Sequence, residues 1–164
     1  MCGSNTVLAG FVAILMTFVT TSDLAAQSQT STLVKHRQSV MEQMGKTFGV
    51  FIPILKGKNQ NVGDAVVAAA TVNTLAKQIT AIFPKGSGRD AVPESRAKSE
   101  VWSKRMEFEA AAARLVQESG KLIDAARTNH IQSFRAQFKA FATSCGGCHS
   151  GKSAKGGKFR FAKN

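Results

Sequence analysis

Four segments of this chain repeat apolar side chains at intervals of three and four residues, and this spacing constrains the fold more than any other feature. Three of them extend from about residue 31 to 55, 62 to 83 and 99 to 127. The fourth repeats Ile131, Phe134, Phe138, Phe141, Cys145 and Cys148. Such spacing places the repeated side chains along one face of an α-helix. Because short connections join the segments, the sequence predicts an all-α protein, an antiparallel four-helix bundle with up-down-up-down order.

Prolines and polar residues indicate where these helices end. Pro53 is expected to kink or close the first helix and Pro84 to end the second, because proline lacks the amide hydrogen that a helix interior needs. Residues 84–93 are rich in glycine and polar side chains, which is typical of a loop. Thr128 or Asn129 is expected to cap the last helix at its N-terminus.

The N-terminus resembles a secretory signal. Residues 7–20 are uncharged and mostly apolar, but this run is shorter than the roughly 20 residues that span a bilayer. Small residues at Ala25 and Ala26 follow it, so we predict a signal peptide over 1–26, cleaved near Ala26, with an uncleaved anchor as the alternative. Cys2 would leave with this segment. The remaining residues 27–164 are then a single exported domain, located in the periplasm.

The chemistry of the chain is concentrated in Cys145-Gly146-Gly147-Cys148-His149. Cys-x-x-Cys-His is the attachment signature of c-type haem. On a helix, two thiols three residues apart point to one side and can bond the two haem vinyl groups. The histidine that follows can then reach the iron as an axial ligand. The motif predicts one covalent haem c per chain, near the C-terminal end of the last helix.

Three other interpretations of the two cysteines are open. A reactive dithiol needs a strand before a helix N-terminus, whereas this motif ends a helix. A zinc site would have to recruit His36 or His130 as a further ligand. A plain disulfide is strained at this spacing within a helix. Haem is favoured because the motif is complete and because c-type haem is attached after export.

With these features together, the chain resembles the class II cytochromes c, the cytochrome c′ family, whose members carry this motif in the last of four helices. Residues 37–41 (RQSVM) are similar to the family's Arg-x-x-x-(Met/Leu) motif, in which the fifth residue faces the distal side of the haem. Residues 97–102 (AKSEVW) are similar to the family's Pro-Glu-Ile-Trp stretch. The resemblance covers essentially the whole of 27–164 and includes low-spin Met/His members of the family. It also implies a homodimer through the first helix.

Three residues of the first helix are assigned roles at this haem. Arg37 lies on the apolar face, where a guanidinium needs a partner, and a haem propionate is a natural one. Gln38 is expected to assist, as its family counterpart does. Met41 is either a distal ligand of the iron, a cover that leaves the iron five-coordinate, or a core side chain.

The sequence departs from the family after the motif. An aromatic–basic pair usually follows the histidine within a few residues, whereas Phe159 and Arg160 come later here. The basic residue expected near His149 is therefore Lys152 or Arg160.

These features predict an exported mono-haem cytochrome that transfers electrons, with His149 as proximal ligand. The alternative is a five-coordinate protein that binds nitric oxide or carbon monoxide at an open distal face. The formal charge of +12 favours a redox partner with an acidic docking surface, and neither nucleic-acid binding nor stable membrane insertion after cleavage is expected. Glu107, Glu109 and Glu118 are interpreted as a solvated helix face, so no acid–base pair indicates an enzyme.

Overall fold

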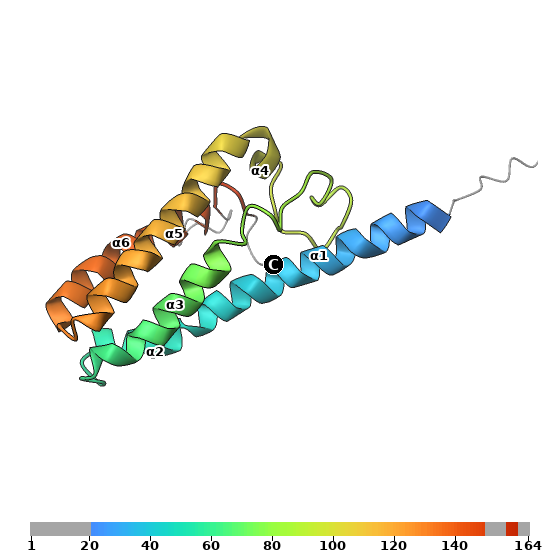
Figure 1. Cartoon of the computed structure of the whole chain (residues 1–164). Coiled ribbons are helices and arrows are strands. Elements are labelled where there is room, and N and C mark those ends of the chain that lie inside the picture. Colours follow the sequence, from blue (N-terminus) through green and yellow to red (C-terminus); the bar gives the residue numbers. More distant parts are fainter. Residues whose placement is uncertain (1–20, 150–156, 161–164) are drawn as a thin grey trace, which may run out of the picture.

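The computed structural model describes residues 21–149 and 157–160, and its regular elements are all helices (Figure 1). The elements in chain order are α1 (Thr21–Lys46), α2 (Phe48–Leu55), the 3₁₀ turn η1 (Val62–Asp64), α3 (Ala65–Ala76), α4 (Glu100–Ser103), α5 (Arg105–Arg127) and α6 (Ile131–His149).

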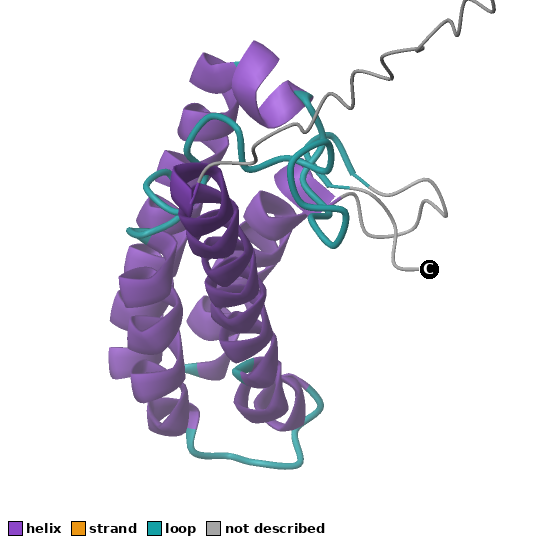
Figure 2. Cartoon of the chain, turned by 90° about the vertical axis from the view of Figure 1, so that its right-hand side faces the viewer, coloured by secondary structure: helices purple, strands orange, loops and turns teal. Residues whose placement is uncertain are grey.

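The long helices form the predicted antiparallel four-helix bundle. The chain runs along α1 and α2, returns through α3, runs back along α5 and returns again through α6 (Figures 1 and 2). Helix α5 packs against both α3 and α6, and α2 also contacts α3 and α6. The fold class expected from the apolar spacing is therefore confirmed.

The first predicted segment ends at Leu55, as expected, but it is interrupted at Thr47, which was not predicted. Helix α1 ends at Lys46, and α2 begins one residue later and contains Pro53. The hydroxyl and the amide of Thr47 both donate to the carbonyl oxygen of Met44, at 2.6 and 3.3 Å. The chain leaves α2 through Gly57, whose φ of 70° is a conformation that favours glycine.

The second and third helices also differ from their predicted ranges. Helix α3 ends at Ala76 rather than near residue 83, and Lys104 separates α4 from α5. Residues 77–82 form turns, and the carbonyl oxygens of Thr80 and Phe83 accept hydrogen bonds from Arg105 at 2.9 and 3.0 Å. These distant donors satisfy backbone groups that a longer helix would have paired internally.

Helix α6 is capped by a residue other than the two predicted from the sequence. The ring Nδ1 of His130 accepts the Ser133 amide at 3.4 Å, whereas the Thr128 hydroxyl accepts the His130 amide at 3.3 Å. Asn129 has a positive φ of 51°. His130 therefore occupies the capping position that was expected at Thr128 or Asn129.

A cluster of phenylalanine rings fills the end of the bundle where α2 meets α6. Phe51 lies with its ring centroid 6.1, 5.7 and 5.9 Å from those of Phe134, Phe138 and Phe141, and Phe48 joins the same group. Phe51, Phe134 and Phe141 are fully buried. This packing follows from the predicted apolar faces of the first and last segments.

Glu118 is not part of a solvated face, which corrects the interpretation from sequence. Its side chain is buried at the contact of α5 with α6, where the Gln137 amide donates to its carboxylate at 2.7 Å. Lys121 also pairs with it, at 3.2 Å. Glu107 and Glu109 are exposed, as expected.

None of the helices in the part of the chain described here combines the length and the apolarity needed to cross a membrane. The apolar run 7–20 and Cys2 of the predicted signal peptide lie outside the described residues, and α1 begins at Thr21. Cleavage near Ala26 stays a prediction.

Replacing Phe51 by alanine is expected to lower the free energy of unfolding by about 3–5 kcal/mol, because it leaves a cavity inside the aromatic cluster. The matched control is Met106→Ala on α5, whose side chain is 84% exposed and whose loss should cost no more than about 0.5 kcal/mol. Urea unfolding of both variants measures the difference. Equal costs for the two would contradict the buried position of Phe51.

Glu118→Gln is expected to reduce the acid sensitivity of the fold. Hydrogen bonds from Gln137 and Lys121 lower the pKa of Glu118 below its ordinary value. A depressed carboxyl pKa contributes stability that is present above the unfolded-state value and is lost as the pH falls through the folded-state value. Urea midpoints measured between neutral pH and about pH 3 should therefore fall less steeply in the variant. Parallel pH profiles for the two proteins would refute this role.

Candidate functional site

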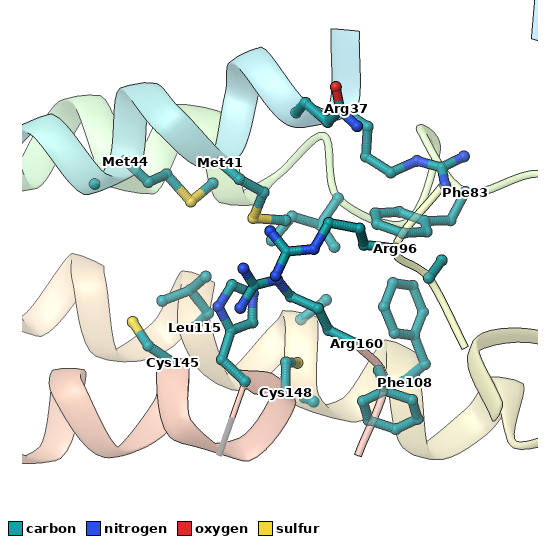
Figure 3. A pocket seen from close by; sticks show the side chains of 18 of the residues that line it. Arg37, Met41, Met44, Phe83, Arg96, Phe108, Leu115, Cys145, Cys148 and Arg160 are labelled. Carbon is teal, nitrogen blue, oxygen red and sulfur yellow. The ribbon is translucent and has the colours of Figure 1, made fainter. Parts of the chain in front are cut away.

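A cavity of about 580 Å³ lies between α1, α5 and the C-terminal end of α6, and Phe48 of the phenylalanine cluster lines one side of it (Figure 3). This volume is within the roughly 300–1,000 Å³ typical of cofactor and ligand pockets. Its walls are mostly apolar. The predicted site residues that line it are Arg37, Gln38, Met41, Cys145, Cys148 and His149.

Both motif cysteines face this cavity from α6. The helix continues without interruption through the motif to His149, so Cys145 and Cys148 lie on one side of it, half-buried and not joined to each other. Burial raises the pKa of Cys145, and it raises the pKa of Cys148 to about 11, with a smaller contribution from the neighbouring thiol. A reactive dithiol needs the opposite shift, so the two groups fit attachment sites better than a redox centre.

The zinc interpretation finds no ligand set among residues 21–149 and 157–160, where no three histidine, cysteine or acidic side chains cluster. His36 is exposed on α1. His130 lies at the first turn of α6, whereas the cysteines lie at its last turns. The side chains that would complete a zinc site are therefore not near the thiols.

His149 is held as a neutral imidazole at the cavity. It is half-buried, and burial lowers its pKa; the nearby charges of Arg160 and Arg96 lower it further. The neutral ring is the form that binds a metal ion. The structure thus places the predicted proximal ligand beside the two thiols, in a state suited to ligation.

Met41 lies across the cavity from α6. Its side chain extends from α1 with the sulfur directed into the cavity, and Met44 lies one turn further along the same helix (Figure 3). Phe108 and Leu115 of α5 complete this apolar wall. The position agrees with a residue on the distal side of a bound group, and a Met41 bond to iron stays a prediction.

Arg37 has partners within the protein that the sequence did not reveal. Its Nε donates to the Ile82 carbonyl oxygen at 2.9 Å, and its two terminal nitrogens donate to Ser87, at 3.2 Å to the carbonyl oxygen and 2.7 Å to the hydroxyl. Its guanidinium carbon lies 4.0 Å from the centroid of the Phe83 ring. Burial lowers the pKa of Arg37 to about 10, so the group is charged at neutral pH. The expectation that this arginine needs a partner is right, and a propionate contact stays a prediction.

Gln38 is exposed, and its amide donates to the Glu94 carbonyl oxygen at 3.2 Å. Like Arg37, it ties α1 to the long connection between α3 and α4. Its role at a propionate also stays a prediction.

Arg96 and Phe159 line the cavity, although neither was predicted as a site residue. The sequence also left open whether Lys152 or Arg160 is the basic residue near His149. Arg160, rather than Lys152, lies beside His149 among the described residues, and Lys152 falls outside them. Phe159 is buried, and its amide donates to the Cys148 carbonyl oxygen at 3.4 Å. The aromatic–basic pair Phe159–Arg160 is the sequence signal for these residues, because the chain folds back and places this pair beside the motif.

This cavity is suited to a haem bound through thioethers. It supplies two thiols on one helical face, a neutral imidazole next to them and a thioether opposite, inside apolar walls. A four-helix bundle with such a site defines a haem-binding cytochrome of the class II type.

The comparisons with known proteins identify the family. The model of the family described as Cytochrome C' matches residues 32–151, so the chain belongs to the cytochrome c′ family, whose members bind haem.

Two curated relatives are similar over most of the chain. The cytochrome c′ of Alcaligenes xylosoxydans xylosoxydans is 32% identical over 120 residues, which cover 71% of this chain and 88% of the relative. The cytochrome c-556 of Agrobacterium tumefaciens (strain II Chrys) is 29% identical over 117 residues, which cover 71% and 92%.

A solved structure shares the fold. It is a ferrous variant of the cytochrome c′ of Alcaligenes xylosoxidans with bound NO, with a TM-score of 0.67 and 25% identity, and the match covers 80% of this chain and 94% of that one.

Arg37→Gln is expected to lower the free energy of unfolding by about 2–3 kcal/mol, because the Ile82 and Ser87 carbonyl groups lose their buried donor. Arg114→Gln removes an equal charge from an exposed position of α5 and should cost no more than about 0.5 kcal/mol. Urea unfolding of the haem-loaded proteins measures both. Indistinguishable midpoints would show that Arg37 does not hold the segment 82–87.

Proposed function

We propose that this protein is an exported mono-haem c-type cytochrome that carries electrons and is not an enzyme. The observation that carries the proposal is that Cys145, Cys148 and His149 reach one apolar cavity from consecutive turns of α6, with Met41 opposite. The family membership supports haem, and the motif supports its covalent attachment.

In this proposal each side chain of the cavity has a defined task. Cys145 and Cys148 would hold one haem c through thioether bonds, and His149 would bind its iron on the proximal side. Bound haem iron supplies one-electron chemistry between its ferrous and ferric states. Phe108 and Leu115 exclude water from the cavity, and the walls around the site are fixed by hydrogen bonds such as those of Arg37. A dry and rigid site changes little between oxidation states, which favours electron transfer.

Met41 decides between the two candidate functions. A bond from its thioether would occupy the sixth position and raise the reduction potential, as in other Met/His cytochromes. The alternative is a five-coordinate protein that binds nitric oxide or carbon monoxide at an open distal face. The apolar distal wall and the NO complex of the related cytochrome c′ favour this second candidate.

Location and partners belong to the same proposal. The predicted signal peptide 1–26 supports a periplasmic protein. The charge of +12 supports an acidic docking surface on the redox partner, since opposite charges steer encounter between proteins. A homodimer through α1 is proposed from the family resemblance.

The test is the visible spectrum of the protein, matured with the c-haem attachment machinery and recorded oxidised and reduced, with and without carbon monoxide. If Met41 binds the iron, the reduced wild type gives sharp, split bands that carbon monoxide leaves unchanged. Met41→Ala then becomes sensitive to carbon monoxide. Met44→Ala is the matched control, because Met44 lines the same cavity from the same helix and should leave the spectrum unchanged.

A reduced wild type whose broad bands shift with carbon monoxide would reverse the order of the two candidates. Intact mass measurement tests the attachment separately: the wild type should carry the mass of one haem, and a Cys145→Ala/Cys148→Ala variant should carry none. Matured protein without haem absorbance would overturn both candidates.

A further inference from the structure

We propose that Arg96 and Arg160 form the cationic pair that receives a carboxylate of the bound haem, one of its propionates, whereas Arg37 fixes the cavity wall. This inference rests on the proposed haem function. It reassigns a role that the family resemblance gave to Arg37 and Gln38.

A short antiparallel contact brings the two arginines together from distant parts of the chain. Ala97 and Arg160 form an isolated β-bridge, and the Lys98 amide donates to the Phe159 carbonyl oxygen at 3.1 Å. Phe159 is buried against Phe108 of α5, with ring centroids 5.4 Å apart. The backbone around both arginines is therefore held by pairing and by an aromatic anchor.

The same C-terminal segment is pressed against the haem motif. The backbone of Gly157 lies so close to Cys148 and His149 that a Cβ atom there would overlap the Cys148 carbonyl oxygen. The Gly157 amide donates to the Arg160 carbonyl oxygen at 2.8 Å, and Lys158 pairs with Glu107 of α5. The backbone of Arg160 is therefore held in place beside His149 by these contacts.

Both arginine side chains extend into the cavity between α1 and α6 (Figure 3). The carboxylate among the lining residues, that of Glu42, is exposed and pairs with Lys46 at 2.9 Å. Among the described residues, Arg160 forms no ion pair with a carboxylate. Burial and the charge of Arg96 both lower the pKa of Arg160.

Arg160 has no carboxylate partner among the described residues and lies beside the like charge of Arg96, so an anion placed against Arg160 would be stabilised there. Guanidinium groups present paired N–H donors that match the two oxygens of a carboxylate. A haem supplies that group in its propionates. The pair therefore fits the anionic edge of the cofactor that the motif attaches.

Arg37 is less suited to this role. Each of its three guanidinium nitrogens already donates to the segment 82–87, and the residue is only 5% exposed. Turning toward a propionate would leave buried carbonyl groups without their donor.

The experiment compares haem-loaded wild type with Arg96→Gln, Arg160→Gln, Arg37→Gln and the exposed control Arg114→Gln. Resonance Raman spectra report the propionate bending mode, and the reduction potential measured against pH reports the propionate pKa. Arg96→Gln and Arg160→Gln should each shift the bending mode. Each should also raise the propionate pKa by about one unit or more, because a nearby cation lowers a carboxyl pKa by about 1–3 units. Arg114→Gln should leave both signals near the wild type, and Arg37→Gln should shift them less than either Arg96→Gln or Arg160→Gln does.

Two further variants separate the effect of the position of Arg160 from the effect of its charge. Phe159→Ala keeps Arg160 but removes its anchor, and it should raise the propionate pKa in the same direction. Arg160→Lys keeps a cation and should restore part of the wild-type signal.

Covalent haem with wild-type propionate signals in both Arg96→Gln and Arg160→Gln would overturn the assignment while leaving the proposed function intact. A shift found only in Arg37→Gln would overturn the assignment and show that Arg37 of α1 contacts the propionate instead. Failure of the wild type to carry haem would instead overturn the proposed function.

Discussion

The buried guanidinium of Arg37 is the interaction on which the open end of this bundle depends. Ile79 and Phe83 line the cavity from a stretch that lies outside the regular helices, so side-chain donors are needed to hold its backbone. Arg37 binds the segment 82–87 to α1, and Arg105 binds Thr80 and Phe83 to α5. Trp102 adds a further hydrogen bond, from its indole nitrogen to the Pro84 carbonyl oxygen at 2.8 Å. These hydrogen bonds hold the irregular stretch 80–87 against α1 and α5, where it forms one wall of the site.

The two ends of the molecule are stabilised in different ways. Where α2 meets α6, Phe51, Phe134 and Phe141 fill the interior completely, and apolar burial gives that end its stability. Around the cavity, Met41 of α1 and the two cysteines of α6 are half-buried, and hydrogen bonds of the wall residues add to the apolar contacts. Helix α6 links both regions, which places the attachment motif on a helix whose first half is anchored in the core.

The C-terminal return shows how a displaced motif can keep its position in space. Phe159 and Arg160 come later after His149 than the family pattern leads one to expect, yet the pairing with Ala97 and the burial of Phe159 bring them back to it. The charge of Arg160 then contributes to keeping the imidazole of His149 neutral. The charges that act on His149 therefore come from two segments far apart in the sequence, through Arg96 and Arg160.

The sequence by itself determined the helical class, the order of the four long helices, the attachment motif and the helix face that carries Met41, because these follow from spacing within a few turns. It could not predict the breaks at Thr47 and Lys104, the end of α3 at Ala76, or the cap at His130. Nor could it show that Arg37 binds Ser87 or that Arg160 meets Arg96. These features depend on donors and charges that lie far apart in the sequence, and only the packed bundle brings them within bonding distance.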